Sequence, residues 1–135
     1  MEIYQSVIEG IVAQAHAALP GECCGLLIGT PLEIHDAHRA RNLDTASTRF
    51  FIDPRDHFAA IHAARESRRF VVGVYHSHPR GAATPSTADL AEASYDDYVY
   101  LIVGLHSEPP ELRLFRIEEG IFVEEEIVVS RGTDP

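Results

Sequence analysis

Three short apolar runs constrain the fold of this chain more than any other feature of its sequence. They cover residues 23–29, 70–77 and 99–105, and turn-forming or polar residues bound them. Continuous apolar runs of this length are typical of buried strands. Because none approaches the roughly 20 apolar residues of a membrane span, they predict the strands of a globular sheet and no membrane-spanning segment.

Helices are predicted on either side of these runs. Apolar side chains recur at helical spacing over residues 1–19, which predicts an amphipathic helix. Asp53, which precedes a proline, is a typical N-cap, so a second helix is expected over about residues 54–67. Its packed side is expected to contain Phe58, Ile61 and Ala64 or Arg65. A third helix is expected over residues 86–95.

The remaining apolar segments predict further strands. These cover residues 33–42, 50–52, 111–118 and 121–129. The last two would form a hairpin through a turn at Glu119-Gly120. The expected fold class is therefore α/β, a single mixed, curved β-sheet flanked by helices, with residues 1–135 forming one domain.

The charge balance excludes most nucleic-acid and anionic membrane partners. The chain has 21 acidic and 11 basic residues, a formal net charge of −10, and every basic residue is an arginine. Such a chain is repelled by phosphate backbones and anionic lipids unless its arginines cluster strongly. The short arginine groups at 39/41 and 65–69 are expected to be solvated surface, so neither nucleic acid nor membrane is an expected partner.

The two cysteines, Cys23 and Cys24, are adjacent in the sequence. They cannot build a disulfide framework, and a bond between neighbours would be strained. We expect them to be reduced and buried; the alternative is a redox-sensitive or metal-linked thiol beside Glu22. The first residues lack the basic and apolar regions of a signal peptide, so a cytoplasmic protein is expected. The sequence gives no signal for an oligomeric state.

The residues that point to chemistry gather between positions 76 and 89. If the strand continues through His78, then His76 and His78 face the same way, because side chains alternate along a strand. Their α-carbons would lie about 6.6 Å apart, so both imidazoles can converge on one ion at Zn–N distances of about 2.0–2.1 Å. Asp89 would complete a three-ligand set. The fourth position of a zinc ion would then hold water, as in catalytic zinc sites.

Each part of this motif has a simpler interpretation when it is taken alone. A His-x-His pair on a strand can consist of two exposed residues without a specific role, or of two buried residues whose hydrogen-bonding groups have partners in the core. Ser86 and Asp89 form a Ser-x-x-Asp pattern, which is typical of a helix-capping box. Glu22 alone would be a surface charge at a helix–strand junction. The two histidines, Pro79, Ser86 and Asp89 occur together at fixed spacing, however, and this favours the metal site.

The pattern resembles the signature of a known family. His76-x-His-Pro, six residues and then Ser-x-x-Asp, ending at Asp89, is similar to the motif of the JAMM (MPN+) zinc metalloproteases. Residues 20–29, with the sequence PGECCGLLIG, are similar to the Glu-x-x-Gly-Leu-Leu-x-Gly strand of that family. The resemblance covers residues 3–129, and the expected elements follow the family's order.

This resemblance implies a role for each motif residue. His76, His78 and Asp89 would hold Zn²⁺, Glu22 would be the general acid/base, and Ser86 would stabilise the tetrahedral oxyanion. All five positions are filled, which argues against the catalytically silent branch of the family. The whole chain would be a single JAMM/MPN metalloprotease domain, with an architecture similar to that of cytidine deaminases.

The short chain looks most like the stand-alone prokaryotic branch, because it leaves little room for the insertions with which eukaryotic members grip ubiquitin. The resemblance implies a zinc-dependent hydrolase of peptide or isopeptide bonds. Its expected partner is a ubiquitin-like or sulfur-carrier protein, cleaved after a C-terminal Gly-Gly tail in a narrow groove beside the zinc. Arg80, and Arg39 with Arg41, are candidates to help hold that tail or its carrier.

Two alternatives remain open from the sequence. A RadC-like JAMM protein shares a glycine two residues after the motif proline, Gly81 here, but usually has an asparagine where Ser77 stands and an extra N-terminal domain. A non-enzymatic MPN-type scaffold would bind a partner through the same fold. Nucleobase deaminases are excluded because the Pro-Cys-x-x-Cys ligands are absent from the sequence.

The acidic, lysine-free composition leads to a first prediction. We hypothesise that the chain is adapted to high salt, since self-repulsion at a net charge of −10 is screened by added ions. The melting temperature should therefore rise as KCl is added. A melting temperature that stays constant or falls across the titration would contradict the hypothesis.

Overall fold

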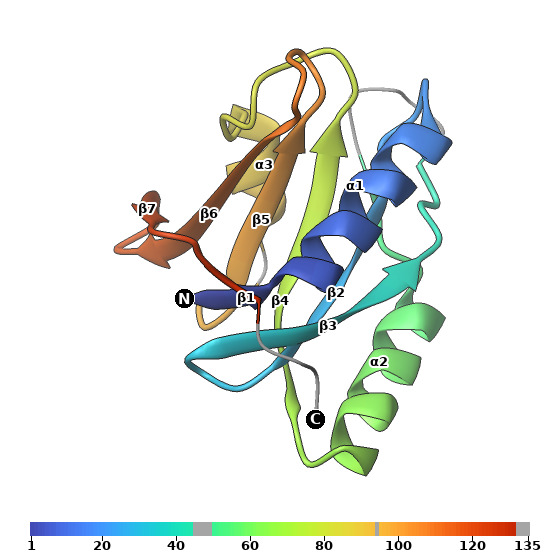
Figure 1. Cartoon of the computed structure of the whole chain (residues 1–135), viewed down its shortest axis with the longest axis vertical. Helices are drawn as coiled ribbons and strands as arrows, with labels where there is room; N and C mark the ends of the chain where they lie inside the picture. Colours follow the sequence, from blue (N-terminus) through green and yellow to red (C-terminus); the bar gives the residue numbers. More distant parts are fainter. Residues whose placement is uncertain (45–49, 94, 132–135) are drawn as a thin grey trace.

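The computed structural model describes residues 1–44, 50–93 and 95–131, with the backbone alone at residues 91 and 92. The helices are α1 (Gln5–Ala18), α2 (Pro54–Glu66) and α3 (Thr87–Glu92). The strands are β1 (Glu2–Tyr4), β2 (Cys24–Gly29), β3 (Glu33–Ala40), β4 (Phe70–His78), β5 (Val99–Gly104), β6 (Glu111–Glu118), β7 (Ile121–Glu125) and β8 (Val128–Ser130) (Figure 1). Among the described helices, none has the length and apolar character needed to cross a bilayer.

The strands form one mixed sheet in the order β7-β6-β5-β4-β2-β3-β1-β8. Strand β4 runs parallel to β5, and β1 runs parallel to both β3 and β8, whereas the other neighbours are antiparallel. β7 and β8 lie at opposite ends of this order, yet only residues 126–127 separate them in the chain. The sheet must therefore curl to bring its two edges together, which confirms the predicted mixed, curved sheet.

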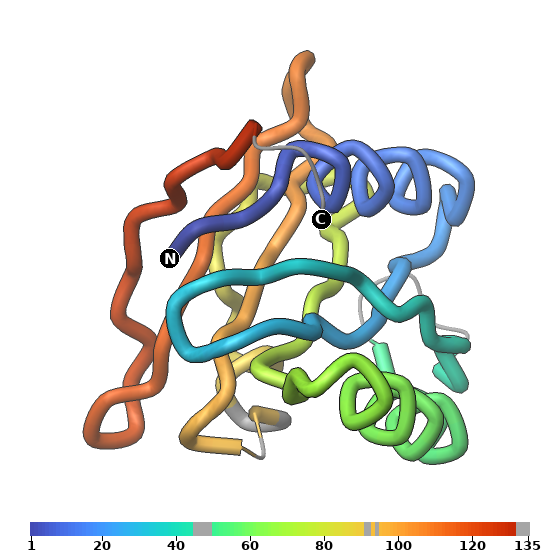
Figure 2. The backbone as a smooth tube through the Cα atoms, turned by 60° about the horizontal axis from the view of Figure 1, so that its bottom comes forward, coloured from blue at the N-terminus to red at the C-terminus, as the bar shows by residue number. Residues whose placement is uncertain are grey.

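The two longer helices cover opposite faces of the sheet. The buried side of α1 packs against Leu27 and Tyr75, whereas Ala60 and Ala64 of α2 pack against Val74. Tyr75 and Val74 are neighbours on β4 and therefore point to opposite faces. Figure 2 shows α1 and α2 on either side of the β2–β3 hairpin. Each of the three short apolar runs is a central strand, β2, β4 or β5, as the sequence predicts.

The hairpin between β6 and β7 follows the prediction at its turn. Glu118 pairs with Ile121, and the two residues between them have φ values of +51° at Glu119 and +78° at Gly120. A type I′ turn requires positive φ at both central residues, and its twist matches that of the flanking strands. Gly120 adopts this conformation without steric cost.

Two predicted boundaries at the chain ends are wrong. The helix expected over residues 1–19 starts only at Gln5, because the preceding residues form β1, in which Ile3 pairs with both Ile34 and Val129. The single strand expected over residues 121–129 is divided into β7 and β8, which pair with different neighbours. In both places a pairing between distant segments overrides the local pattern.

Three further expectations need correction. Residues 50–52 form no strand, and only Ile52 makes an isolated bridge, to Asn42. Phe58 is 77% exposed, because Ala60 and Ala64 form the packed side of α2. The helix expected over residues 86–95 ends at Glu92; residue 94 lies outside the described residues.

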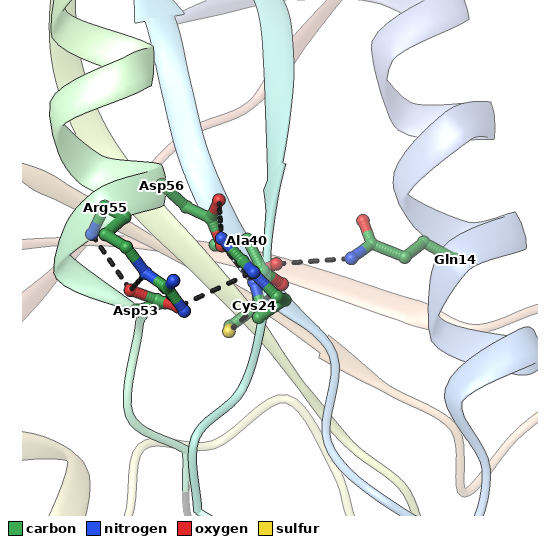
Figure 3. Close-up of polar contacts among 7 residues, drawn as sticks. Gln14, Cys24, Ala40, Asp53, Arg55 and Asp56 are labelled. Carbon is green, nitrogen blue, oxygen red and sulfur yellow. Dashed lines mark hydrogen bonds and ion pairs between the residues drawn. The ribbon is translucent and has the colours of Figure 1, made fainter.

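The start of α2 is fixed by an ionic network that ties it to the end of β3 (Figure 3). Asp53 caps the helix as predicted, accepting a hydrogen bond of 2.9 Å from the Arg55 backbone, and its carboxylate also lies 2.8 Å from Nη2 of Arg55. Arg41, just after β3, binds Asp56 through Nε and Nη2 at 3.1 and 3.2 Å. The hydrogen bonds from the Arg55 side chain and backbone lower the pKa of Asp53 to about 2.

This network gives a pH-dependent stability that can be measured. The pKa of Asp53 lies below its value of about 3.9 in an unfolded chain, so its stabilising effect is complete above about pH 4 and is lost as the pH falls toward 2. We expect the free energy of unfolding to fall more steeply over this range in the wild type than in Asp53→Asn, which keeps a capping oxygen but does not titrate. Urea titrations at constant ionic strength would test this, and parallel curves for the two proteins would contradict it.

Candidate metal centre

The end of β4 and the start of α3 bring the predicted ligands together. His76 and His78 are two residues apart on β4, which extends to His78 as the argument requires. Both side chains therefore point to the same face of the sheet. The chain then turns at Pro79 and returns to a short helix, whose N-cap is Ser86 and whose third residue is Asp89.

The potential ligand atoms of these three side chains form a compact triangle. Nε2 of His76 lies 3.2 Å from Nε2 of His78 and 3.2 Å from Oδ1 of Asp89, and Nε2 of His78 lies 3.1 Å from Oδ2 of Asp89. Two ligands at about 2.0–2.1 Å from a tetrahedral zinc are about 3.3 Å apart. Two imidazoles and a carboxylate are also ligand types that zinc prefers, so the residues present fit this ion.

His78 is oriented by a backbone partner. Its Nδ1 lies 2.8 Å from the carbonyl oxygen of Ala82. Because a carbonyl can only accept, Nδ1 must carry a proton. In the neutral ring Nε2 then has a lone pair for a metal ion, whereas in the protonated ring Nε2 can donate to Asp89. The loop that supplies this carbonyl passes so close to Gly104 that a Cβ there would lie 2.5 Å from the nitrogen of Ala83. Gly104 thus permits the approach that fixes the tautomer of His78.

Asp89 is oriented by the predicted capping box. The backbone N–H of Ser86 donates to Oδ2 of Asp89 at 2.8 Å, and the backbone N–H of Asp89 donates to Oγ of Ser86 at 3.0 Å. Burial alone would raise the pKa of Asp89, but hydrogen bonds with His76 and His78 outweigh this effect and hold it well below its ordinary range. The carboxylate therefore carries a negative charge at neutral pH, which favours a bound cation.

Glu22 and Ser86 line the same cleft as one of the histidines. This cleft has a volume of about 380 Å³, and its walls include Glu22, His78, Arg80 and Ser86. Glu22 is 6% exposed and lies two residues before β2 begins. The resemblance assigns it the acid/base role, and the structure brings it to the edge of the metal centre. The hydroxyl of Ser86 accepts one hydrogen bond and retains its own proton to donate.

The other two predicted ligands border a mainly apolar cleft of about 390 Å³. His76 and Asp89 form part of its wall. Its aromatic lining residues are Phe50, Phe51, Tyr95, Tyr100 and Phe122. The ring of Phe50 stacks on His76, with centroids 4.3 Å apart and planes at 19°. Sequence reasoning missed this cleft, because its walls come from segments far apart in the chain and no short motif marks them.

The candidate arginines differ in their placement. Arg80 lines the cleft that contains Glu22. Arg39 instead borders a cavity between α1 and β3 that Tyr75 also lines, on the face opposite His76. Arg41 is paired with Asp56, as described above. Of the three, only Arg80 is therefore placed beside the metal centre.

The cysteines are free thiols and are buried, which agrees with their predicted structural role. Burial raises the pKa of Cys23, and it raises the pKa of Cys24 to about 12. Both thiols are therefore protonated at neutral pH. A protonated, buried thiol is neither a good nucleophile nor a ready metal ligand, so the metal-linked alternative for these residues has no support.

A mixed sheet whose central strand ends in two histidines, joined by an aspartate from the next helix, defines a candidate metal centre of the JAMM kind. The chain belongs to the family of prokaryotic homologs of the JAB domain, whose model matches residues 4–118. This membership confirms the resemblance carried by the motifs. The same fold occurs in a JAB1/MPN domain protein from Archaeoglobus fulgidus, at 23% identity and a TM-score of 0.60 over 95% of this chain and 99% of that one.

Two curated relatives and one further structure are similar over long stretches. A desampylase from Haloferax volcanii is 36% identical over 87 residues, which are 62% of this chain and 62% of that protein. A CysO-cysteine peptidase from Mycobacterium tuberculosis is 28% identical over 130 residues, which are 94% of this chain and 89% of that protein. The solution structure of protein DSY2949 from Desulfitobacterium hafniense has a TM-score of 0.90 at 31% identity, over 98% of this chain and 94% of that one.

The geometry predicts how zinc content depends on the ligands. His78→Ala removes one of the three predicted ligands, so we expect zinc affinity to fall by at least about 100-fold, since the loss of an outer-shell partner alone costs about 10–100-fold. His62→Ala is the matched control, because His62 lies on the exposed side of α2 with a side chain 79% exposed. Metal analysis after dialysis against a weak chelator should show zinc in the wild type and the control only. Equal zinc in all three proteins would exclude this site.

Proposed function

We propose that residues 1–135 form a single zinc-dependent metalloprotease domain that cleaves a peptide or isopeptide bond after the C-terminal Gly-Gly of a ubiquitin-like or sulfur-carrier protein. The observation that carries the proposal is the triangle of His76, His78 and Asp89, with Glu22 and Ser86 in the adjoining cleft. The similarity to a desampylase and to a CysO-cysteine peptidase supports this class of substrate. The free, buried cysteines are compatible with activity in the reducing cytoplasm.

Each residue of the candidate site has a different role in the proposed reaction. His76, His78 and Asp89 would hold the zinc ion, which would supply a Lewis acid for the scissile carbonyl and a bound water with a pKa of about 7. Glu22 accepts a proton from the attacking water and passes it to the leaving amine. Ser86 donates a hydrogen bond to the oxyanion that develops on the carbonyl. Its position is maintained by the backbone N–H of Asp89, which binds the same hydroxyl oxygen.

The substrate tail must reach the centre in an extended form. His78 and Glu22 lie along one cleft and His76 along the other, so a chain that passes the metal centre contacts both sets of walls. Glycine residues let the backbone approach closely, whereas larger side chains would hold the scissile bond away from the metal. Arg80, at the edge of the cleft with Glu22, is the candidate to bind a carboxylate or carbonyl oxygen of the carrier.

The proposal is tested by removing the acid/base while keeping the metal. Glu22→Gln preserves the size of the side chain but cannot move a proton, so we expect kcat to fall by about 10²–10⁴-fold at an unchanged zinc content. Glu9→Gln, on the exposed side of α1, is the matched control and should keep wild-type turnover. The assay follows release of the residue beyond Gly-Gly from purified carrier proteins by mass spectrometry.

The alternatives make different predictions in the same experiment. A non-enzymatic scaffold needs no stoichiometric zinc and would be unaffected by Glu22→Gln in every assay. A RadC-like protein would leave each carrier intact. Intact carriers after incubation with zinc-loaded wild-type protein, across several candidates, would contradict the substrate assignment.

A further inference from the structure

The peptide group that joins Glu22 to Cys23 is held from two sides, by the side chain of Asn42, which follows β3, and by that of Ser77 on β4. Nδ2 of Asn42 donates to the carbonyl oxygen of Glu22 at 3.0 Å. The backbone N–H of Cys23 donates to Oγ of Ser77 at 2.9 Å, and the backbone N–H of Ser77 returns a bond of 3.1 Å to the carbonyl of Cys23. Three hydrogen bonds therefore fix the backbone at the proposed acid/base.

Asn42 makes its contacts from a rigid position. Its Oδ1 accepts hydrogen bonds from the backbone N–H of Asp44 at 3.0 Å and of Phe51 at 2.9 Å. Its neighbour Arg41 is tied to the start of α2, where the backbone N–H of Asp53 donates to its carbonyl at 3.0 Å. The side-chain amide of Asn42 thus has two separate functions. Its oxygen accepts hydrogen bonds from the backbone at Asp44 and Phe51, and its nitrogen donates to the carbonyl of Glu22.

Ser77 holds the Glu22–Cys23 peptide from the side opposite Asn42. It lies between His76 and His78 on β4 and is fully buried. Because its side chain points to the opposite face from those of the two histidines, its hydroxyl is available to Cys23. The backbone next to Glu22 is therefore hydrogen-bonded directly to β4, the strand that carries two of the three predicted ligands.

We propose that Asn42 is a positioning residue, which acts through the Glu22–Cys23 peptide to hold the Glu22 carboxylate at a fixed place beside the metal centre. The inference rests on the proposed function for its effect on catalysis, but not for its effect on the backbone. A general base must stay within hydrogen-bond reach of its proton, and a displacement of about 1 Å can cost about 10²-fold in rate. A peptide group held on one side only would allow such displacements.

The two functions of Asn42 can be separated by substitution. Asn42→Asp keeps oxygen acceptors for Asp44 and Phe51 but loses the N–H donor to Glu22, whereas Asn42→Ala loses both and adds no charge. Arg41→Gln is the matched control, because it breaks the pairing with Asp56 next door and leaves the contacts of Asn42 in place. An effect shared by both Asn42 variants and absent from the control is due to the bond to Glu22.

The first measurement needs neither zinc nor substrate. Hydrogen exchange followed by NMR should be at least about tenfold faster at the Cys23 amide in both Asn42 variants than in the wild type, because a peptide held on one side opens more often. The amide of Leu27, farther along β2, should change by less than about twofold. In Arg41→Gln both amides should exchange as in the wild type. Unchanged exchange at Cys23 in both Asn42 variants would overturn the proposal.

The second measurement tests the catalytic consequence. With a cleavable carrier, both Asn42 variants should lose about 10- to 100-fold in kcat, with KM and zinc content within about twofold of the wild type. A kcat within twofold of the wild type in both variants, despite faster exchange at Cys23, would show a purely structural role and overturn the proposal. If the wild type cleaves no carrier, the proposed function fails, and the exchange rates still decide whether Asn42 holds this peptide.

Discussion

The antiparallel pairing of β2 with β4 is the constraint on which the rest of the site depends. Cys24 lies opposite His76, and the bonds between Cys23 and Ser77 continue this pairing beyond the end of β2. The register brings Glu22 to the cleft that His78 lines. Because side chains alternate along a strand, a slip of one residue would turn both histidines toward α1. The geometry of the metal centre is therefore a consequence of sheet register and not of the motif alone.

The capping box shows that the two interpretations of Ser86 and Asp89 are compatible. A helix of six residues, such as α3, has little stability of its own, so its start must be fixed by local hydrogen bonds. The same bonds that fix it leave both carboxylate oxygens of Asp89 within 3.2 Å of histidine nitrogens. The capping carboxylate is thus also oriented as a candidate metal ligand, and the structural bonds restrict the rotamers available to it.

The sequence alone predicted the structural features that depend on neighbouring residues. It did not predict those that depend on contacts between distant segments. The N-cap at Asp53, the hairpin turn and the spacing of the histidines depend on neighbouring residues, and the structure agrees with each prediction. The strand around Ile3 has a helical pattern and pairs only because β3 and β8 lie beside it. The bond from Asn42 to Glu22 joins residues 20 positions apart, so no spacing rule could reveal it.

The position of the site also follows from topology. Strands β4 and β5 are parallel, so the chain between them must cross over and cannot turn back in a tight hairpin. On the site face of β4, Val74 is packed against α2, whereas His76 and His78, farther along, face the clefts. In open α/β sheets ligands bind at the carboxyl ends of parallel strands. The parallel β4–β5 pair offers the same kind of position, because both histidines lie at the carboxyl end of β4. The crossover has to pass the end of β4, and α3 within it returns Asp89 to the two histidines. The parallel pair requires a connection of this kind in any case, and the same connection supplies the third side chain of the candidate metal centre.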